Sequence, residues 1–373
     1  MLRVFANSIG KNENEATPSS RGSSSSSDLV IPRPLLFSTY YFRDCNMTKI
    51  AIIGAGLSGL SAAHLLKDHA KVTLFEKARG VSGRMSTRRA EPYFFDHGAQ
   101  YFTVRTKAFH DFIQPLINPG IIERWIARYV KFDKNKIIER KNWIDDEPRY
   151  VGVPGMNKIA KHLAEGLNVQ INTRIVSLKR GDAWQLTDES GQLHSDFDWV
   201  ISTVPSPQAT ELLPKTFKYY DDIKGIEMRA CFSLMLGFSE NLPLEFEAAH
   251  VMHSDLSWIA VNSHKPGRED RFALVVHSSE KYSEVHIDDD RETVMQHLMN
   301  VTSNVIGHDV SIADYKTVHG WQYANNAKRE ICNIFLDTDL KLAACGDWCL
   351  GGRVEGAFTS AHNLINTMKK ILK

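Results

Sequence analysis

The sequence predicts an α/β fold made of a βαβ unit and a second, α+β unit. A strand, a glycine turn, a helix and another strand follow one another over residues 49–75. A second glycine-rich turn, at residues 346–356, follows an apolar strand and opens the last helix. The chain has 373 residues, which is more than one compact core usually covers. We therefore expect two structural units.

The composition argues against several kinds of partner. The 45 Lys and Arg residues balance 44 Asp and Glu residues, so no overall field attracts nucleic acid or a membrane surface. No apolar run reaches the roughly 18 residues that a membrane span needs. The five cysteines form no CxxC pair, which argues against a disulfide framework or a structural metal. The expectation is a soluble, cytoplasmic protein without a metal.

Residues 1–46 differ in composition from the rest, with a serine run at Ser23–Ser27 and scattered prolines. This composition predicts a disordered extension or a targeting segment. Three interpretations stay open: a start of translation at Met47, a transit peptide that would send the protein to an organelle, or a native flexible tail. The serines suit a transit peptide, whereas acidic residues such as Glu13 and Asp28 do not.

The strand Lys49–Ile53 leads into a G-x-G-x-x-G turn, and the strand Lys71–Phe75 follows the next helix. This is the pattern of a Rossmann-type dinucleotide-binding domain. The turn would hold a pyrophosphate at the start of the helix, predicted there over Leu60–Leu66. Glu76 ends the second strand and would accept hydrogen bonds from ribose hydroxyls. The predicted cofactor contacts of this unit are Gly54, Ala55, Gly56, Leu57, Ser58, Gly59, Glu76 and Lys77.

The loop Arg79–Ser86 favours FAD over NAD, because a plain NAD domain would run on into another helix here. Gly83 would allow a close approach of the cofactor. Arg84 would pair with the pyrophosphate through a charge-assisted fork. Val176 is a further predicted cofactor contact.

The middle of the chain predicts alternating elements. A helix is expected over Met156–Leu167, and a polar helix over Arg291–Ile306. Strands are expected at Gln170–Leu178, Ala183–Thr187, Trp199–Thr203, Cys231–Phe238, Phe272–His277 and Lys341–Ala344. The FAD-binding domain is predicted as 47–106, 151–207 and 325–373, and the substrate domain as 107–150 and 208–324.

The segment Cys345–Ala357 carries four glycines where a helix cap needs one, which indicates a second cofactor contact. In flavoproteins of the glutathione-reductase type, which this segment resembles, an Asp at such a strand end binds ribityl or phosphate groups. That residue would be Asp347. The predicted contacts here are Gly346, Asp347, Arg353, Val354, Glu355 and Gly356. Because Cys345 and Cys349 form no CxxC pair, we expect non-covalent FAD.

The region 48–373 resembles the bacterial renalases, within the flavin amine oxidase superfamily. The segments that carry the resemblance are Gly83–Ser86, Asp96–Thr103, Val151–Met156, Leu256–Trp258, His319–Ala324 and the C-terminal turn. It implies a two-domain flavoprotein of the hydroxybenzoate-hydroxylase type. The implied reaction is oxidation of 1,2- and 1,6-dihydro isomers of NAD(P), with hydride passing to flavin N5 and oxygen becoming hydrogen peroxide.

Such a donor expels hydride without help from a protein acid or base, so no catalytic acid or base is assigned. The enzyme must instead orient the rings. The predicted substrate contacts are Gln100, Tyr101, Trp258, His277, Trp321 and Tyr323. Each aromatic residue has the alternative of being an ordinary core residue. A flavin amine oxidase acting on a small amine, and a non-catalytic FAD-binding protein, stay open as alternative functions.

Overall fold

The structure is a computed structural model that describes residues 47–145, 147–268, 271–326 and 334–372. Residues 46–373 form one compact unit. The prediction for residues 1–46 lies outside the described residues.

Short strands outnumber helices in the first half of the chain. Its elements are β1 (Lys49–Ile53), α1 (Leu57–Leu66), β2 (Lys71–Phe75), β3 (Thr87–Ala90), β4 (Tyr93–Asp96), α2 (Lys107–Ile117), β5 (Ile122–Arg124), β6 (Arg128–Asp133), β7 (Lys136–Asn142), β8 (Tyr150–Gly152), α3 (Asn157–Leu163), β9 (Asn168–Gln170), β10 (Ile175–Arg180), β11 (Trp184–Asp188), β12 (Leu193–Phe197) and β13 (Trp199–Ser202).

Longer strands dominate the second half. Its elements are α4 (Ser206–Leu212), α5 (Tyr220–Lys224), β14 (Met228–Gly237), β15 (Ala248–Met252), β16 (Leu256–Val261), β17 (Ala273–Ser278), α6 (Glu280–His286), α7 (Arg291–Ile306), β18 (Tyr315–Asn326), β19 (Phe335–Asp337), β20 (Leu342–Ala344) and α8 (Val354–Met368).

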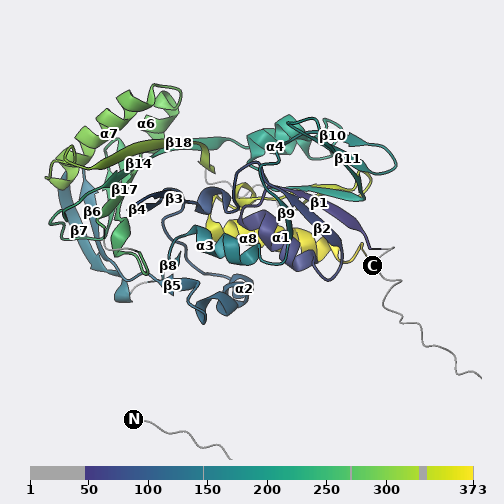
Figure 1. Cartoon of the computed structure of the whole chain (residues 1–373), viewed down its shortest axis with the longest axis horizontal. Coiled ribbons are helices and arrows are strands. Elements are labelled where there is room, and N and C mark those ends of the chain that lie inside the picture. The colour runs from purple at the N-terminus through teal and green to yellow at the C-terminus, as the bar shows by residue number, and fades with distance from the viewer. Residues whose placement is uncertain (1–46, 146, 269–270, 327–333, 373) are drawn as a thin grey trace, which may run out of the picture. The chain divides into compact units, whose positions relative to one another are not determined.

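The first large sheet has six strands in the order β19-β20-β13-β1-β2-β9. All its pairs are parallel except β19 with β20. Its strands are buried on both faces, as parallel strands usually are. In β1, Ile50 and Ile52 face the helices α1, α3 and α8, whereas Ala51 and Ile53 face the core shared with the small sheet β10-β11-β12. Figure 1 shows α1, α3 and α8 gathered beside β1 and β2.

The second large sheet has seven strands in the order β18-β14-β17-β16-β15-β6-β7. Helices α6 and α7 cover one face, where residues such as Leu234, Val276 and Leu298 form a separate core (Figure 1). The opposite face carries the β3–β4 hairpin, whose Tyr93 and Phe95 pack on Met235, Ala273 and Val275.

These two sheets confirm the predicted α/β class with a second α+β unit. The strands of the first sheet all fall in segments predicted for the FAD-binding domain. Those of the second sheet fall in segments predicted for the substrate domain, except that β18 runs two residues past its predicted limit at 324. The domain boundaries themselves stay a prediction.

Two predicted elements were wrong in detail. The single strand expected at Gln170–Leu178 is two strands, β9 and β10, which belong to different sheets. Between them Asn172 has a φ of 52°, a left-handed conformation that no regular strand contains. The helix expected to reach Leu167 ends at Leu163, because Gly166 adopts a φ of 77°.

Candidate cofactor and substrate site

The first glycine turn has the geometry that a bound pyrophosphate requires. Gly54 has a φ of 105° and sits in the tight turn after β1. A Cβ on Gly59 would lie 2.0 Å from the carbonyl oxygen of Gly54, so helix and turn touch there. A Cβ on Gly56 would meet nothing within 4 Å. The Gly56 cap of α1 makes no side-chain hydrogen bond to the first N–H groups of the helix, which are the groups that bind an anion at a helix start.

Glu76 is buried beside this turn, with an exposed fraction of 7%. Its Oε2 accepts a hydrogen bond of 2.8 Å from the backbone N–H of Ala55. Its Oε1 accepts one of 2.9 Å from the N–H of Ala78. Each carboxylate oxygen keeps a second lone pair. Glu76 therefore holds the turn in place and can still accept a bond from a ribose hydroxyl.

The loop Arg79–Ser86 packs directly against the first turn. Gly83 has a φ of 52°, and a Cβ there would lie 3.4 Å from the Cα of Gly56. The carbonyl of Arg84 accepts a bond of 2.9 Å from the N–H of Ala99. A Cβ on Gly98 would lie 1.9 Å from that same oxygen, so this contact requires a glycine.

Arg84 and Asp347, both predicted as cofactor contacts, form a two-bond ion pair with each other. The guanidinium Nη1 lies 2.9 Å from Asp347 Oδ2, and Nη2 contacts Oδ1. Nη1 also donates to the carbonyl of Ala324, at 3.1 Å. This pair joins the N-terminal loop to the C-terminal turn, across 263 residues of sequence.

The C-terminal turn meets α1. Gly351 and Gly352 have φ values of 79° and 73°, and Ser58 Oγ donates a bond of 2.9 Å to the carbonyl of Ala357. Gly346 precedes Asp347 in extended backbone and packs on the Trp348 ring.

The start of α8 holds four of the predicted cofactor contacts. Arg353 is exposed at the N-terminal end of α8, and Val354 is half-buried in the first turn. Gly356 is buried in that turn, where a Cβ would lie 3.2 Å from the carbonyl oxygen of Leu350.

Glu355, the fourth of these contacts, has another partner for its side chain. Its carboxylate accepts bonds from the N–H of Arg105, at 3.0 Å, and from the N–H and hydroxyl of Thr106, both at 2.7 Å. Thr106 is the cap of α2. The carboxylate therefore fixes the start of α2, and a contact of Glu355 with the cofactor stays a prediction.

Two predicted cofactor contacts lie at the periphery. Lys77 is exposed just after β2, and Val176 is 47% exposed on β10. The backbone around Lys77 is tied to the segment before Val176, because the N–H of Thr173 donates to the carbonyl of Glu76 at 2.8 Å.

One row of directly paired residues crosses all seven strands of the second sheet, on the face opposite α6 and α7. Residues paired across neighbouring strands point to the same side of a sheet. From β18 to β7, the row consists of His319, Ser233, His277, Trp258, His250, Lys131 and Glu139. Polar and aromatic side chains in every strand make this face a candidate binding face, since the other face is apolar.

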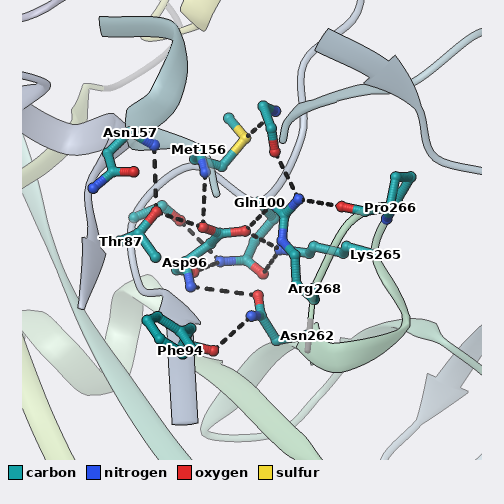
Figure 2. A network of polar contacts seen from close by, with 12 residues as sticks. Thr87, Phe94, Asp96, Gln100, Met156, Asn157, Asn262, Lys265, Pro266 and Arg268 are labelled. Atoms are coloured by element: carbon teal, nitrogen blue, oxygen red, sulfur yellow. Dashed lines mark hydrogen bonds and ion pairs between the residues drawn. The ribbon is translucent and has the colours of Figure 1, made fainter. Parts of the chain in front are cut away.

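Gln100 connects this row to a buried ionic network (Figure 2). Its Nε2 donates to the carbonyls of Asp96 and Gly98, the latter at 3.0 Å, and lies 3.3 Å from His277 Nε2. Its Oε1 accepts a bond of 3.2 Å from Lys265 Nζ. The amide of Gln100 is thus engaged on both sides, and it orients the Asp96–Gln100 segment.

Asp96 is fully buried, and its Oδ2 contacts both Lys265 and Arg268 (Figure 2). It also accepts a bond of 2.9 Å from the N–H of Met156. Burial alone would raise the pKa of Asp96, but the two cations outweigh it and bring the pKa to about 2. Asp96 therefore stays ionised and holds both cations in the core.

Lys265 was missed by sequence reasoning. Its side chain has no exposed area, and its Nζ lies 3.4 Å from Asp96 Oδ2. Burial lowers the pKa of Lys265 to about 8, although Asp96 opposes the shift. The available signal was the polar segment Asn262–Arg268, which directly follows the buried strand β16 and holds a Lys and an Arg.

The histidines of this face stay neutral at pH 7. Burial and then His319 lower the pKa of His97 to about 4. Burial, then Lys265 and His97, lower the pKa of His277 to about 3. Burial and then Arg88 lower the pKa of His319 to about 4. These imidazoles offer hydrogen bonds and ring surfaces without charge.

Trp321 contacts His97 in two ways. Its ring stacks on the His97 ring with centroids 5.2 Å apart. Its Nε1 donates a hydrogen bond of 2.8 Å to the backbone carbonyl of His97. Tyr323 lies two residues further along β18. Among the residues that the structure describes, no hydrogen bond or ring contact joins Tyr323 to Gln100, and the contact of Tyr323 with a substrate stays a prediction.

Tyr101 and Trp258 contact each other, with ring centroids 5.6 Å apart. Both line a cleft of about 400 Å³ on the same face of the sheet. Since Tyr101 follows Gln100 and Trp258 pairs with His277, the cleft adjoins the Gln100–His277 group.

Two segments of this chain match known protein families. Residues 52–116 match the NAD(P)-binding Rossmann-like domain. Residues 129–363, more than half of the chain, match the flavin containing amine oxidoreductases. The chain belongs to the flavin-containing amine oxidoreductase family. Proteins of this family are oxidoreductases that contain a flavin.

Individual relatives of this flavin oxidoreductase are distant. It is 26% identical to renalase of Mus musculus over 180 residues, which cover 44% of this chain and about half (49%) of that relative. Its fold resembles a structure described as a protoporphyrinogen oxidase of Exiguobacterium sp. 255-15, with a TM-score of 0.71, 12% identity, and coverage of 87% and 99% of the two chains. It also resembles putrescine oxidase bound to putrescine, with a TM-score of 0.62, 11% identity, and coverage of 86% and 98%.

In the described part of this flavin oxidoreductase, no helix combines the length and apolar character that crossing a bilayer demands.

Proposed function

We propose that the protein holds FAD non-covalently and oxidises 1,2- and 1,6-dihydro isomers of NAD(P), as the resemblance to renalases implies. The observation that carries the proposal is the binding face of the second sheet. There His277 and Trp258 adjoin Gln100. The imidazoles of His97, His277 and His319 have pKa values of about 4 or below. Such a face orients a ring that gives up hydride unaided.

The residues present fit FAD. Gly56 leaves open space at the uncapped start of α1, where a pyrophosphate accepts backbone N–H bonds. Glu76 would accept from the ribose, and the Arg84–Asp347 pair would face the middle of the cofactor. When bound, FAD supplies a hydride acceptor whose electrons pass on to O₂ to give hydrogen peroxide. Non-covalent binding is supported by Cys345, whose pKa burial raises well above its usual value, leaving no reactive thiolate.

The chain's own groups would position the substrate. The Asp96–Lys265–Arg268 network fixes Gln100, and Gln100 contacts His277. Ser233 Oγ and Trp258 Nε1 are buried on or beside this face with no hydrogen-bond partner among the described residues. An unpaired buried polar atom costs about 1–3 kcal/mol, which a bound ligand can recover.

Amine oxidation is the second candidate, because it is the reaction after which the family is named. The buried cation Lys265 beside Gln100 disfavours a positively charged amine at this point, so an amine would have to bind as the neutral base.

The test is anaerobic mixing of the yellow protein with candidate donors. We expect 1,2- and 1,6-dihydro-NAD to bleach the flavin rapidly, and admission of oxygen to yield one peroxide per donor. If ordinary 4-dihydro-NADH bleaches the flavin equally fast, the proposal fails. Bleaching by an amine instead would establish the second candidate. Bound FAD that no donor reduces would identify a non-catalytic binding protein.

A further inference from the structure

One ring nitrogen of His277 faces the side-chain amide of Gln100, and this contact defines which nitrogen of the ring carries a proton. Gln100 Nε2 lies 3.3 Å from His277 Nε2. An amide nitrogen donates hydrogen bonds and does not accept them. His277 Nε2 therefore has to be the acceptor of this contact. A proton on that nitrogen would place two donors against each other.

Contacts at both ends of the Gln100 amide fix its orientation. Its Oε1 lies 3.2 Å from Lys265 Nζ, and a charged lysine can only donate. Its Nε2 donates to the backbone carbonyls of Asp96 and Gly98, which can only accept. Turning the amide over would set an oxygen against two carbonyl oxygens and an NH₂ group against an ammonium. Because Gln100 and Lys265 are both buried, water would not compensate for the lost bonds.

The proton of the neutral His277 ring is therefore on Nδ1. In a neutral imidazole one nitrogen donates and the other accepts. A hydrogen bond from His277 to the backbone of His97 raises the pKa of His277, as a donating Nδ1–H does. Burial, then Lys265 and the His97 ring, outweigh this bond and bring the pKa to about 3. The ring stays uncharged at pH 7.

A neutral His277 matters for a hydride donor of the proposed kind. As hydride leaves a dihydropyridine, the donor ring becomes a pyridinium and gains positive charge. An imidazolium in the same face would repel this charge, whereas a neutral ring does not. His277 belongs to the row of side chains on the candidate binding face, where it pairs directly with Trp258.

We propose that Gln100 is a positioning residue that holds His277 as its neutral Nδ1–H tautomer, with Lys265 fixing the Gln100 amide. The tautomer follows from the contacts alone. Its effect on hydride transfer rests on the proposed function, because it concerns the charge that develops on a dihydropyridine.

Nitrogen NMR of the holoenzyme tests the tautomer in the wild-type protein. The histidines carry ¹⁵N, and the His277 signals are assigned as those missing from His277→Gln. At pH 7 we expect Nε2 to resonate as an unprotonated nitrogen and Nδ1 as a protonated one. A protonated Nε2, or a mixture of the two tautomers, would overturn the inference whether or not any Gln100 variant folds.

The variant Gln100→Met keeps the length of the side chain and removes the donor. We expect the pKa of His277 to rise toward the ordinary value near 6.5, because Nε2 is then free to bind a proton. The titratable groups that face His277 are Lys265, after β16, and His97, after β4, and the substitution leaves both in place. An unchanged pKa and tautomer of His277 in a folded Gln100→Met protein would show that Gln100 does not position the ring.

The matched control is Gln322→Met. Gln322 is exposed on β18 and points away from the face that carries Trp321, since neighbouring residues of a strand alternate. The His277 signals and the pKa of His277 should be those of the wild type. An equal rise of this pKa in both variants would overturn the inference in favour of a general effect of the substitution.

Anaerobic flavin reduction by 1,6-dihydro-NAD at pH 5.5 and 7.5 measures the effect on hydride transfer. We expect wild-type rates that agree to within about two-fold, and a Gln100→Met rate at least roughly three-fold lower at pH 5.5 than at pH 7.5, because protonated His277 repels the developing pyridinium. The same pH dependence in both proteins, despite a raised pKa of His277, would overturn this effect. If no dihydropyridine reduces the flavin, the proposed function fails, and the NMR result still decides the tautomer.

Discussion

At the scale of single residues, the three glycines of the first turn have separate tasks that a methyl group can distinguish. A Cβ on Gly56 meets no protein atom within 4 Å, whereas one on Gly59 lies 2.0 Å from the carbonyl oxygen of Gly54. We expect Gly56→Ala to change the stability of the apoprotein by less than about 1 kcal/mol but to weaken FAD binding. Gly59→Ala should destabilise the fold itself by about 1–3 kcal/mol through overpacking.

Urea unfolding of the apoproteins and fluorescence titration with FAD measure the two effects. Equal FAD affinity of Gly56→Ala and the wild type would show that no cofactor approaches this backbone.

Glu76 combines a structural and a binding task. Glu76→Ala removes an acceptor from the N–H groups of Ala55 and Ala78 and from a ribose, so FAD affinity should fall by about 1–3 kcal/mol. Glu76→Gln keeps one acceptor oxygen and should lose less. Equilibrium dialysis of FAD against both variants checks the order, and undiminished binding by Glu76→Ala would remove the ribose role.

At the scale of elements, Glu355 links α8 to the start of α2. Its carboxylate accepts from Arg105 and Thr106, so Glu355→Gln weakens charged hydrogen bonds. The free energy of unfolding should drop by about 1–3 kcal/mol. FAD affinity should not change, because the side chain faces α2. Denaturant unfolding with a parallel FAD titration gives both values, and a marked loss of FAD affinity would show that the carboxylate itself contacts the cofactor.

The sequence predicted elements well where one local signal decided them. The strands β1 and β2 match their predicted bounds, since buried parallel strands are short apolar runs ended by glycine or charge. The sequence did not reveal β18, whose twelve residues are mostly half-buried and show no clear alternation. Pairing with β14 along most of its length stabilises that strand, and such pairing is not visible in the strand's own residues.

At the scale of the whole molecule, the neutral histidines of the binding face make stability depend on pH. The pKa values of His97, His277 and His319 are about 4, 3 and 4, below the value near 6.5 of the unfolded chain. At pH values between the folded and unfolded pKa values, the unfolded chain binds more protons than the folded protein. The free energy of unfolding therefore rises with pH from about 4 to 6.5, and the full stabilisation is present above pH 6.5.

Denaturant unfolding at several pH values tests this, with His319→Gln expected to flatten the curve. The exposed His69 supplies the control variant His69→Gln, which should leave the slope as it is. Because the pKa values of these three histidines are about 4 or below, their titration should not produce a step in the rate of flavin reduction between about pH 5.5 and 7.

The sequence by itself determined the βαβ unit, the α/β class and the flavin family, because glycines at fixed spacing answer local steric demands of turn, phosphate and helix. Tertiary structure alone decided the ionic core of Asp96, Lys265 and Arg268 and the row of side chains across seven strands. Those residues are far apart in the chain. Their charge states and contacts depend on burial and on the partners that the strand register places beside them.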